Sequence, residues 1–192
     1  MTGKVWQSDS SELNPLVEAY TVGRDYITDM QLIGYDILAS KAHAKMLAQK
    51  DVITSDELIS VTKQLDILDD LVKSGEFAID PGLEDGHTAI EEYLTEHCGE
   101  VGKKIHTGRS RNDQSLVMIR LYSKQIIADI KSDLSLLEKT YDDAIRKVGH
   151  MIMPGYTHMQ KAMPTTVATW LGAYKDGFSD VNKVLDSIFV YI

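Results

Sequence analysis

The stretch from Ile119 to Val148 reads IRLYSKQIIADIKSDLSLLEKTYDDAIRKV and repeats an apolar residue at every third or fourth position. The repeating positions are Ile119, Tyr122, Ile126, Ile130, Leu134, Leu137, Tyr141, Ile145 and Val148. Their mean spacing of about 3.6 residues is the α-helical repeat, and no Pro or Gly interrupts it. Because a helix of this length cannot bury its apolar stripe against one small domain, we expect a helical bundle that neighbouring subunits could share.

Further helices are predicted on both sides of this stretch. Before it, Thr54 and Glu57 form a capping box, and Gly75 is a natural end for the helix that the box begins. The other predicted helices rest on the helical spacing of apolar residues, with turn-forming Asp, Pro and Gly between them. The predicted helices before and after the long one cover about 25–50, 54–74, 87–98 and 165–192. Since no alternating strand pattern of useful length is present, the sequence predicts an all-α protein.

The composition limits the classes of partner. With 20 Lys and Arg against 29 Asp and Glu, the formal net charge is −9, which gives no general attraction for nucleic acid or an anionic membrane. The single cysteine, Cys98, excludes an internal disulfide and fits a reducing compartment. No apolar run is long enough to span a membrane, and no signal peptide is visible. We therefore expect a soluble, cytoplasmic protein.

A basic loop precedes the long helix and is the first candidate site. Lys103, Lys104, Arg109 and Arg111 lie within nine residues, although the chain as a whole is acidic. Backbone amides at a helix N-terminus attract anions, and Arg binds a carboxylate through two parallel hydrogen bonds. One interpretation is a carboxylate-binding loop in which Ser110 and Asn112 add donors. The other is a solvated basic turn in which one of these two residues caps the long helix.

A second candidate site follows the long helix. Pro154 and Gly155 predict a turn, after which Thr157, His158 and Gln160 are crowded between two long apolar helices. A histidine here can exchange a proton near neutral pH, as general acid–base catalysis requires. The alternative is that His158 only caps the end of the preceding helix.

Metal and thiol chemistry have little support in the sequence. The histidines at 43, 87, 106 and 150 have no His, Cys or carboxylate partner at metal-ligand spacing, so we expect no metal site. Cys98 has no evident activating base and is interpreted as a small buried residue.

The two loops resemble those of the argininosuccinate lyase family. Residues 107–114, TGRSRNDQ, match its hallmark loop, and residues 155–160, GYTHMQ, match its second loop. Segment 84–91 and the helix around 35–43 also fit, in the same order, so the resemblance covers nearly the whole chain. Residues 107–114 are the most specific part, because sister enzymes that act on fumarate, aspartate or adenylosuccinate share the helical architecture but not this string.

The resemblance implies a fold and a reaction. The fold is that of the fumarase/aspartase superfamily, with an N-terminal helical domain over 1–111 and the first helices of a central bundle over 112–192. The reaction splits argininosuccinate into arginine and fumarate without a metal or organic cofactor. A base removes a proton next to a carboxylate, donors stabilise the dianionic intermediate, and the guanidinium nitrogen leaves.

The resemblance also implies roles for particular residues. His158 corresponds to the catalytic histidine of the family, and Asn112 and Thr157 correspond to substrate contacts. Other matched positions that would line or orient the site are Ser110, Arg111, Asp85 and His87, with Gln160 and Asp25 as further candidates. Asp25 stands where family members often have a substrate-contacting serine.

Other features of the family are missing from this chain. The family places its other catalytic residue, a serine, on a mobile Gly-Ser-Ser-x-Met-Pro-x-Lys-x-Asn loop, and no such string occurs here. Its sites are assembled from three subunits of a homotetramer. We therefore expect an N-terminal portion of a tetrameric enzyme of arginine biosynthesis, inactive by itself. Two alternatives are a non-catalytic, crystallin-like structural protein and another fumarate-releasing lyase of the superfamily.

Overall fold

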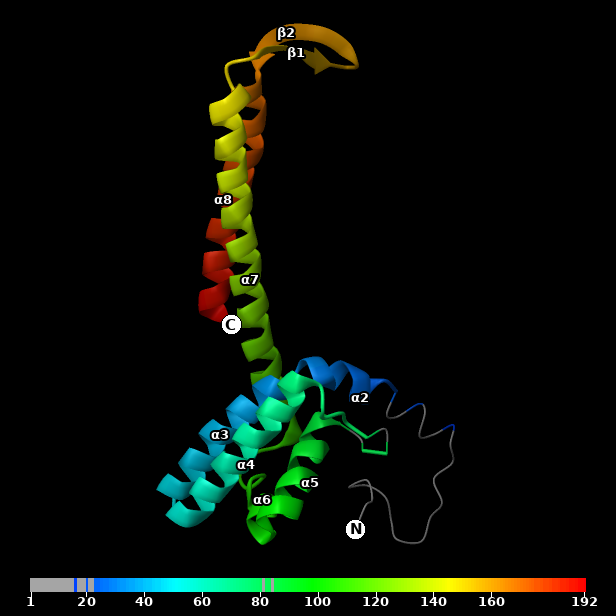
Figure 1. The fold of residues 1–192 in the computed structure, drawn as a ribbon, viewed down its shortest axis with the longest axis vertical. Helices are drawn as coiled ribbons and strands as arrows, with labels where there is room; N and C mark the ends of the chain where they lie inside the picture. The colour runs from blue at the N-terminus through cyan, green and yellow to red at the C-terminus, as the bar shows by residue number, and fades with distance from the viewer. Residues whose placement is uncertain (1–15, 17–19, 21–22, 81, 84) are drawn as a thin grey trace. The chain divides into compact units, whose positions relative to one another are not determined.

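The computed structural model describes residues 16, 20, 23–80, 82–83 and 85–192, which form two compact units (Figure 1). The first unit extends to Tyr122, and the second runs from Ser123 to Ile192. The long helix predicted from the apolar repeat is α7, Arg111–Val148, and it contributes to both units. The prediction of a helical protein is confirmed, with one small hairpin as an addition.

The first unit packs its helices around an apolar core. Its elements before α7 are α2 (Asp25–Thr28), η1 (Asp29–Gln31), α3 (Ile33–Gln49), α4 (Ser55–Ser74), α5 (Gly86–Cys98) and α6 (Glu100–Lys104). Ile37 of α3, Leu65 of α4 and Leu94 of α5 are fully buried together in this core. Tyr35 and Tyr122 pack edge to face with ring centroids 5.8 Å apart, which joins the start of α7 to α3.

The sequence predicts both ends of α4 correctly and the start of α3 incorrectly. Thr54 and Glu57 form both hydrogen bonds of the capping box, and Gly75 ends α4 with a left-handed φ of 76°. The single helix predicted over 25–50 is wrong, because the chain forms α2 and η1 and then restarts at Ile33. The Asp29 carboxylate accepts a hydrogen bond of 2.9 Å from the Gly86 amide, which ties this short irregular segment to the start of α5.

The second unit is an antiparallel helix pair closed by a hairpin. The rest of α7 lies beside α8 (Val167–Tyr191), and β1 (Ile152–Thr157) and β2 (Gln160–Thr166) connect them (Figure 1). Contacts early in α7 involve residues late in α8, which is the pattern of an antiparallel pair. The contacting pairs are Lys124 with Phe189, Lys131 with Asp186, Tyr141 with Phe178, and Asp142 with Lys175.

The hairpin corrects the sequence analysis in two respects. Strands were not predicted, and the turn expected at Pro154 and Gly155 is instead a bulge inside β1. The true turn is at His158 and Met159, whose φ angles are 47° and 63°. Two positive φ values match the twist of a two-residue hairpin turn. The strands are not predictable because most of their residues are exposed and their sequences, IMPGYT and QKAMPTT, do not alternate apolar with polar residues.

Much apolar surface of the second unit remains exposed. None of the residues of α8 is buried, and Val181 and Val184 are exposed on it. Ile126 and Ile130, part of the repeating stripe of α7, are exposed as well. The stripe therefore keeps surface available for packing, as expected for a bundle helix. Within the described part of the chain, no helix is long and apolar enough to cross a membrane.

Candidate active site

The basic loop enters α7 through a side-chain cap. Gly108 makes the turn with a φ of 76°. The Asp113 amide donates to Ser110 Oγ over 3.4 Å, and the Ser110 amide donates to the Asp113 carboxylate over 2.8 Å. Ser110 therefore caps the helix, which confirms that part of the alternative interpretation. Asn112, two residues beyond Ser110, has an exposed side chain.

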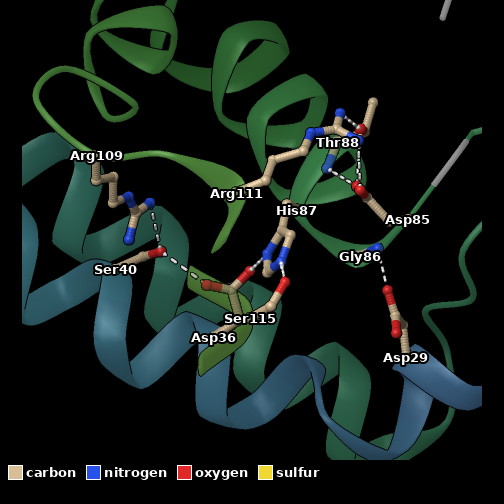
Figure 2. A network of polar contacts seen from close by, with 10 residues as sticks. All are labelled: Asp29, Asp36, Ser40, Asp85, Gly86, His87, Thr88, Arg109, Arg111 and Ser115. Atoms are coloured by element: carbon tan, nitrogen blue, oxygen red, sulfur yellow. Dashed lines mark hydrogen bonds and ion pairs between the residues drawn. The ribbon is translucent and has the colours of Figure 1, made fainter. Parts of the chain in front are cut away.

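Arg111 and Asp85 fix the loop to the start of α5. Arg111 donates to the Asp85 carboxylate over 2.6 Å and to Thr88 Oγ1 over 2.7 Å (Figure 2). Asp85 is also the N-cap of α5, since it accepts a 2.8 Å hydrogen bond from the Thr88 amide. Two of the predicted site residues thus form an ion pair that holds the loop in place.

His87 lies in a buried polar network below this ion pair. Its Nδ1 is 2.5 Å from the carboxylate of Asp36, which is 0% exposed, and its Nε2 is 3.1 Å from Ser115 Oγ (Figure 2). On the other side, Ser40 donates to Asp36 over 3.5 Å and accepts a 3.1 Å hydrogen bond from Arg109. His87, a predicted site residue, is therefore part of a chain of contacts that joins α3, α5 and α7.

Asp36, Ser40 and Ser115 are not among the site residues predicted from the sequence. A signal for the first two was present, because Asp36 and Ser40 are four residues apart on the helix face that also carries Ile33, Ile37 and Ala44. A buried carboxylate on an apolar face needs a partner, so this pattern indicates a polar network. The partner could not be identified from the sequence, because His87 is 51 residues away along the chain.

Burial and nearby charges together shift the pKa values of His87 and Arg109 in opposite directions. Burial alone would lower the pKa of His87, but the hydrogen bond and negative charge of Asp36, with Asp85 and Asp29 nearby, raise it above 6.5 overall. Burial lowers the pKa of Arg109, against the attraction of Asp36 and Asp113. The negative charges around His87 therefore favour its protonated form.

This pair makes stability depend on pH. Because the pKa of His87 is higher in the folded state than the unfolded value near 6.5, its stabilisation is complete below that value and is lost as pH rises through the folded pKa. We expect the free energy of unfolding of the wild type, measured by urea denaturation, to decline between about pH 5.5 and about pH 8.5 as the stabilisation by protonated His87 is lost. The variant His87→Gln should not show this decline. His97→Gln, which changes an exposed histidine of α5, should keep the decline. Parallel profiles for wild type and His87→Gln would contradict the assignment.

The second candidate loop forms the tip of the hairpin. Thr157, His158 and Gln160 are exposed there, and Thr157 pairs with Gln160 across the two-residue turn. The last carbonyls of α7, at Ile145 and Val148, accept hydrogen bonds from backbone amides at 149 and 151. These two carbonyls are bonded by backbone amides, and His158 lies at the hairpin turn with an exposed side chain.

The predicted site residues fall into two groups. Asp85, His87, Ser110, Arg111 and Asn112 belong to the first unit, as does Asp25, an exposed residue at the start of α2. Thr157, His158 and Gln160 belong to the second unit. Among the described residues, no group of three or more His, Cys, Asp or Glu side chains is arranged to hold a metal ion. The first group includes the exposed side chain of Asn112, and the second includes the exposed imidazole of His158.

Known proteins with similar sequences are lyases. The sequence profile of the lyase family matches residues 11–189, so the chain belongs to that family. It is 44% identical to the argininosuccinate lyase of Thermotoga neapolitana over 189 residues, which are 98% of this chain and 47% of the relative. It is 38% identical to the argininosuccinate lyase of Bacteroides thetaiotaomicron, again over 98% of this chain and 42% of the relative. The chain therefore spans about half the length of the curated relatives it matches.

Solved structures show the same fold. A fumarate lyase:delta crystallin from Brucella melitensis matches with a TM-score of 0.76 at 15% identity, over 96% of this chain and 49% of that one. An EDDS lyase variant with bound fumarate matches with a TM-score of 0.71 at 20% identity, over 94% of this chain and 35% of that one. At these identities the likeness supports the architecture, and the predicted resemblance to helical lyases is confirmed at that level.

Proposed function

We propose that this chain supplies residues of the active site of an argininosuccinate lyase, which cleaves argininosuccinate into arginine and fumarate. The observation that carries the proposal is the 107–114 loop, in which Arg111 is locked by Asp85 while Asn112 stays exposed. A locked loop with a free amide is suited to binding a carboxylate without reorganising. The identity to argininosuccinate lyases over nearly the whole chain supports the same substrate.

The proposed reaction needs no metal or organic cofactor. We assign proton transfer to His158, whose place at an exposed tip allows it to approach a substrate held elsewhere. Asn112 and Thr157 donate to substrate carboxylates, and Gln160 and Asp25 are further contacts. Ser110, Arg111, Asp85 and His87 orient the loop, a role supported by their hydrogen bonds within the first unit.

Two further features are proposed for the whole protein. The exposed apolar residues of α7 and α8 support assembly of a homotetramer through a shared helical bundle. The lone Cys98 supports a cytoplasmic enzyme that forms arginine, a step shared by arginine biosynthesis and the urea cycle.

A chimera tests the activity. This chain would replace the matching N-terminal part of the Thermotoga neapolitana enzyme, so that the remainder supplies the rest of the lyase. We expect the chimera to release fumarate from argininosuccinate, measured by ultraviolet absorbance, and the 192-residue chain alone to release little or none.

The substrate panel separates the alternatives. A folded chimera that released fumarate from adenylosuccinate or aspartate, and not from argininosuccinate, would favour another lyase of the superfamily. A folded chimera that neither bound nor cleaved argininosuccinate would favour a crystallin-like structural role, and either result would overturn the proposal.

A further inference from the structure

The polar network of Figure 2 contacts both flanks of the segment 110–114, which carries Asn112. One end of the network is Arg109, directly before the segment, and the other end is Ser115, directly after it (Figure 2). Both ends connect to the carboxylate of Asp36 through one intermediate side chain, Ser40 on one side and His87 on the other. A single buried group on α3 thus reaches both flanks of the segment.

Asp36 is well suited to fix these flanks. Its side chain is buried on a helix that is packed into the apolar core, so its position is rigid. Hydrogen bonds to an ionised group are shorter and about twice as strong as those between neutral groups, and the 2.5 Å contact with His87 is of this kind. Arg111, in the middle of the segment, is held from a different direction by Asp85.

We propose that Asp36 is a positioning residue that acts through Ser40 and His87 to orient Asn112 for carboxylate binding. The inference rests on the proposed function for its effect on catalysis, although the ordering of the segment does not depend on it. Asn112 itself needs no contact with Asp36, because the first turn of α7, whose amides at Asp113 and Gln114 bond to the carbonyl of Ser110, transmits the constraint.

A double-mutant cycle in the chimera tests the coupling. We expect Asn112→Ala to lower kcat/KM about 100-fold, as the loss of one preorganised donor does, and Asp36→Asn to lower it about tenfold through misplacement. If Asp36 acts through Asn112, the double variant should also lose only about 100-fold, because no oriented amide remains to be misplaced. A loss of about 1,000-fold in the double variant, the product of the two, would overturn the inference.

Milder variants guard against misfolding. Ser40→Ala and Ser115→Ala each remove one hydroxyl from one side of the network, and each should lower kcat/KM about fivefold, again only when Asn112 is present. Asp66→Asn is the matched control, since Asp66 is an exposed carboxylate of α4 that pairs with Lys41 of α3 and has no part in the network, and it should leave kcat/KM unchanged.

Hydrogen exchange in the 192-residue chain gives a readout that does not need turnover. We expect Asp36→Asn to speed amide exchange about tenfold at positions 113–115 while the amides of α4 keep their rates. Unchanged exchange at 113–115 would overturn the inference even if the chimera is active. Faster exchange there together with an inactive chimera would support the positioning role and count against the proposed function alone.

Discussion

His158→Asn should lower the kcat of the chimera about 1,000-fold while argininosuccinate still binds. A positioned general acid–base group contributes about 10² to 10⁴ in rate, and the amide of Asn cannot exchange a proton near neutral pH. The backbone at 158 has a φ of 47°, a conformation in which Asn is well tolerated. The substitution therefore keeps the hairpin turn and removes only the imidazole, whereas Ala would strain the turn as well.

The matched control for this prediction is His150→Asn. His150 is an exposed histidine of the same unit, in the connection between α7 and β1, and its replacement should leave kcat unchanged. Fumarate release and argininosuccinate binding would be measured for both variants by ultraviolet absorbance and titration calorimetry. A His158→Asn chimera that keeps more than about a tenth of the wild-type kcat would remove His158 from the chemical step.

The helices were predictable because their signals are local. The spacing of apolar residues identified α7, and the Thr54 and Glu57 pair fixed the start of α4, since both depend on residues only three or four apart. The hairpin was not predictable, because its turn places positive φ angles at His158 and Met159. Neither His nor Met is among the residue types that typically indicate a turn. The sequence instead offered Pro154 and Gly155, which the structure uses for a bulge.

The sequence provided candidate site residues, and their contacts came from the structure. Residues 107–114 pointed to an anion site through their charge and their resemblance to a known loop. The roles within it come from tertiary structure: Arg111 meets Asp85, and His87 meets Asp36, across 26 and 51 residues of chain. Side chains this far apart in sequence leave no periodic signal, so only the packing of α3, α5 and α7 shows that Arg111 is committed to an ion pair.

Gly102→Ala should lower the free energy of unfolding of the chain by about 3 kcal/mol. A Cβ atom at Gly102 would lie 2.4 Å from the Thr95 amide nitrogen and 2.5 Å from the Leu94 carbonyl carbon. Both are backbone atoms of α5, which cannot rotate away as a side chain can, so α6 would have to move off α5. Urea denaturation followed by circular dichroism measures the loss.

The displacement should also reach the candidate site, because α6 leads directly into the basic loop. Its last residue, Lys104, bonds to Glu57 over 2.7 Å, and the next residue, Ile105, is buried in the core. If α6 shifts, the Lys104–Glu57 bond and the packing of Ile105 weaken, and the 107–114 loop moves away from Asp85. Gly34→Ala is the matched control, since its Cβ would meet only a side-chain oxygen of Asp69 at 4.0 Å, and Ala is up to about 1 kcal/mol better than Gly in a helix. Equal stability of the two variants would show that the close approach of α5 and α6 does not fix the loop.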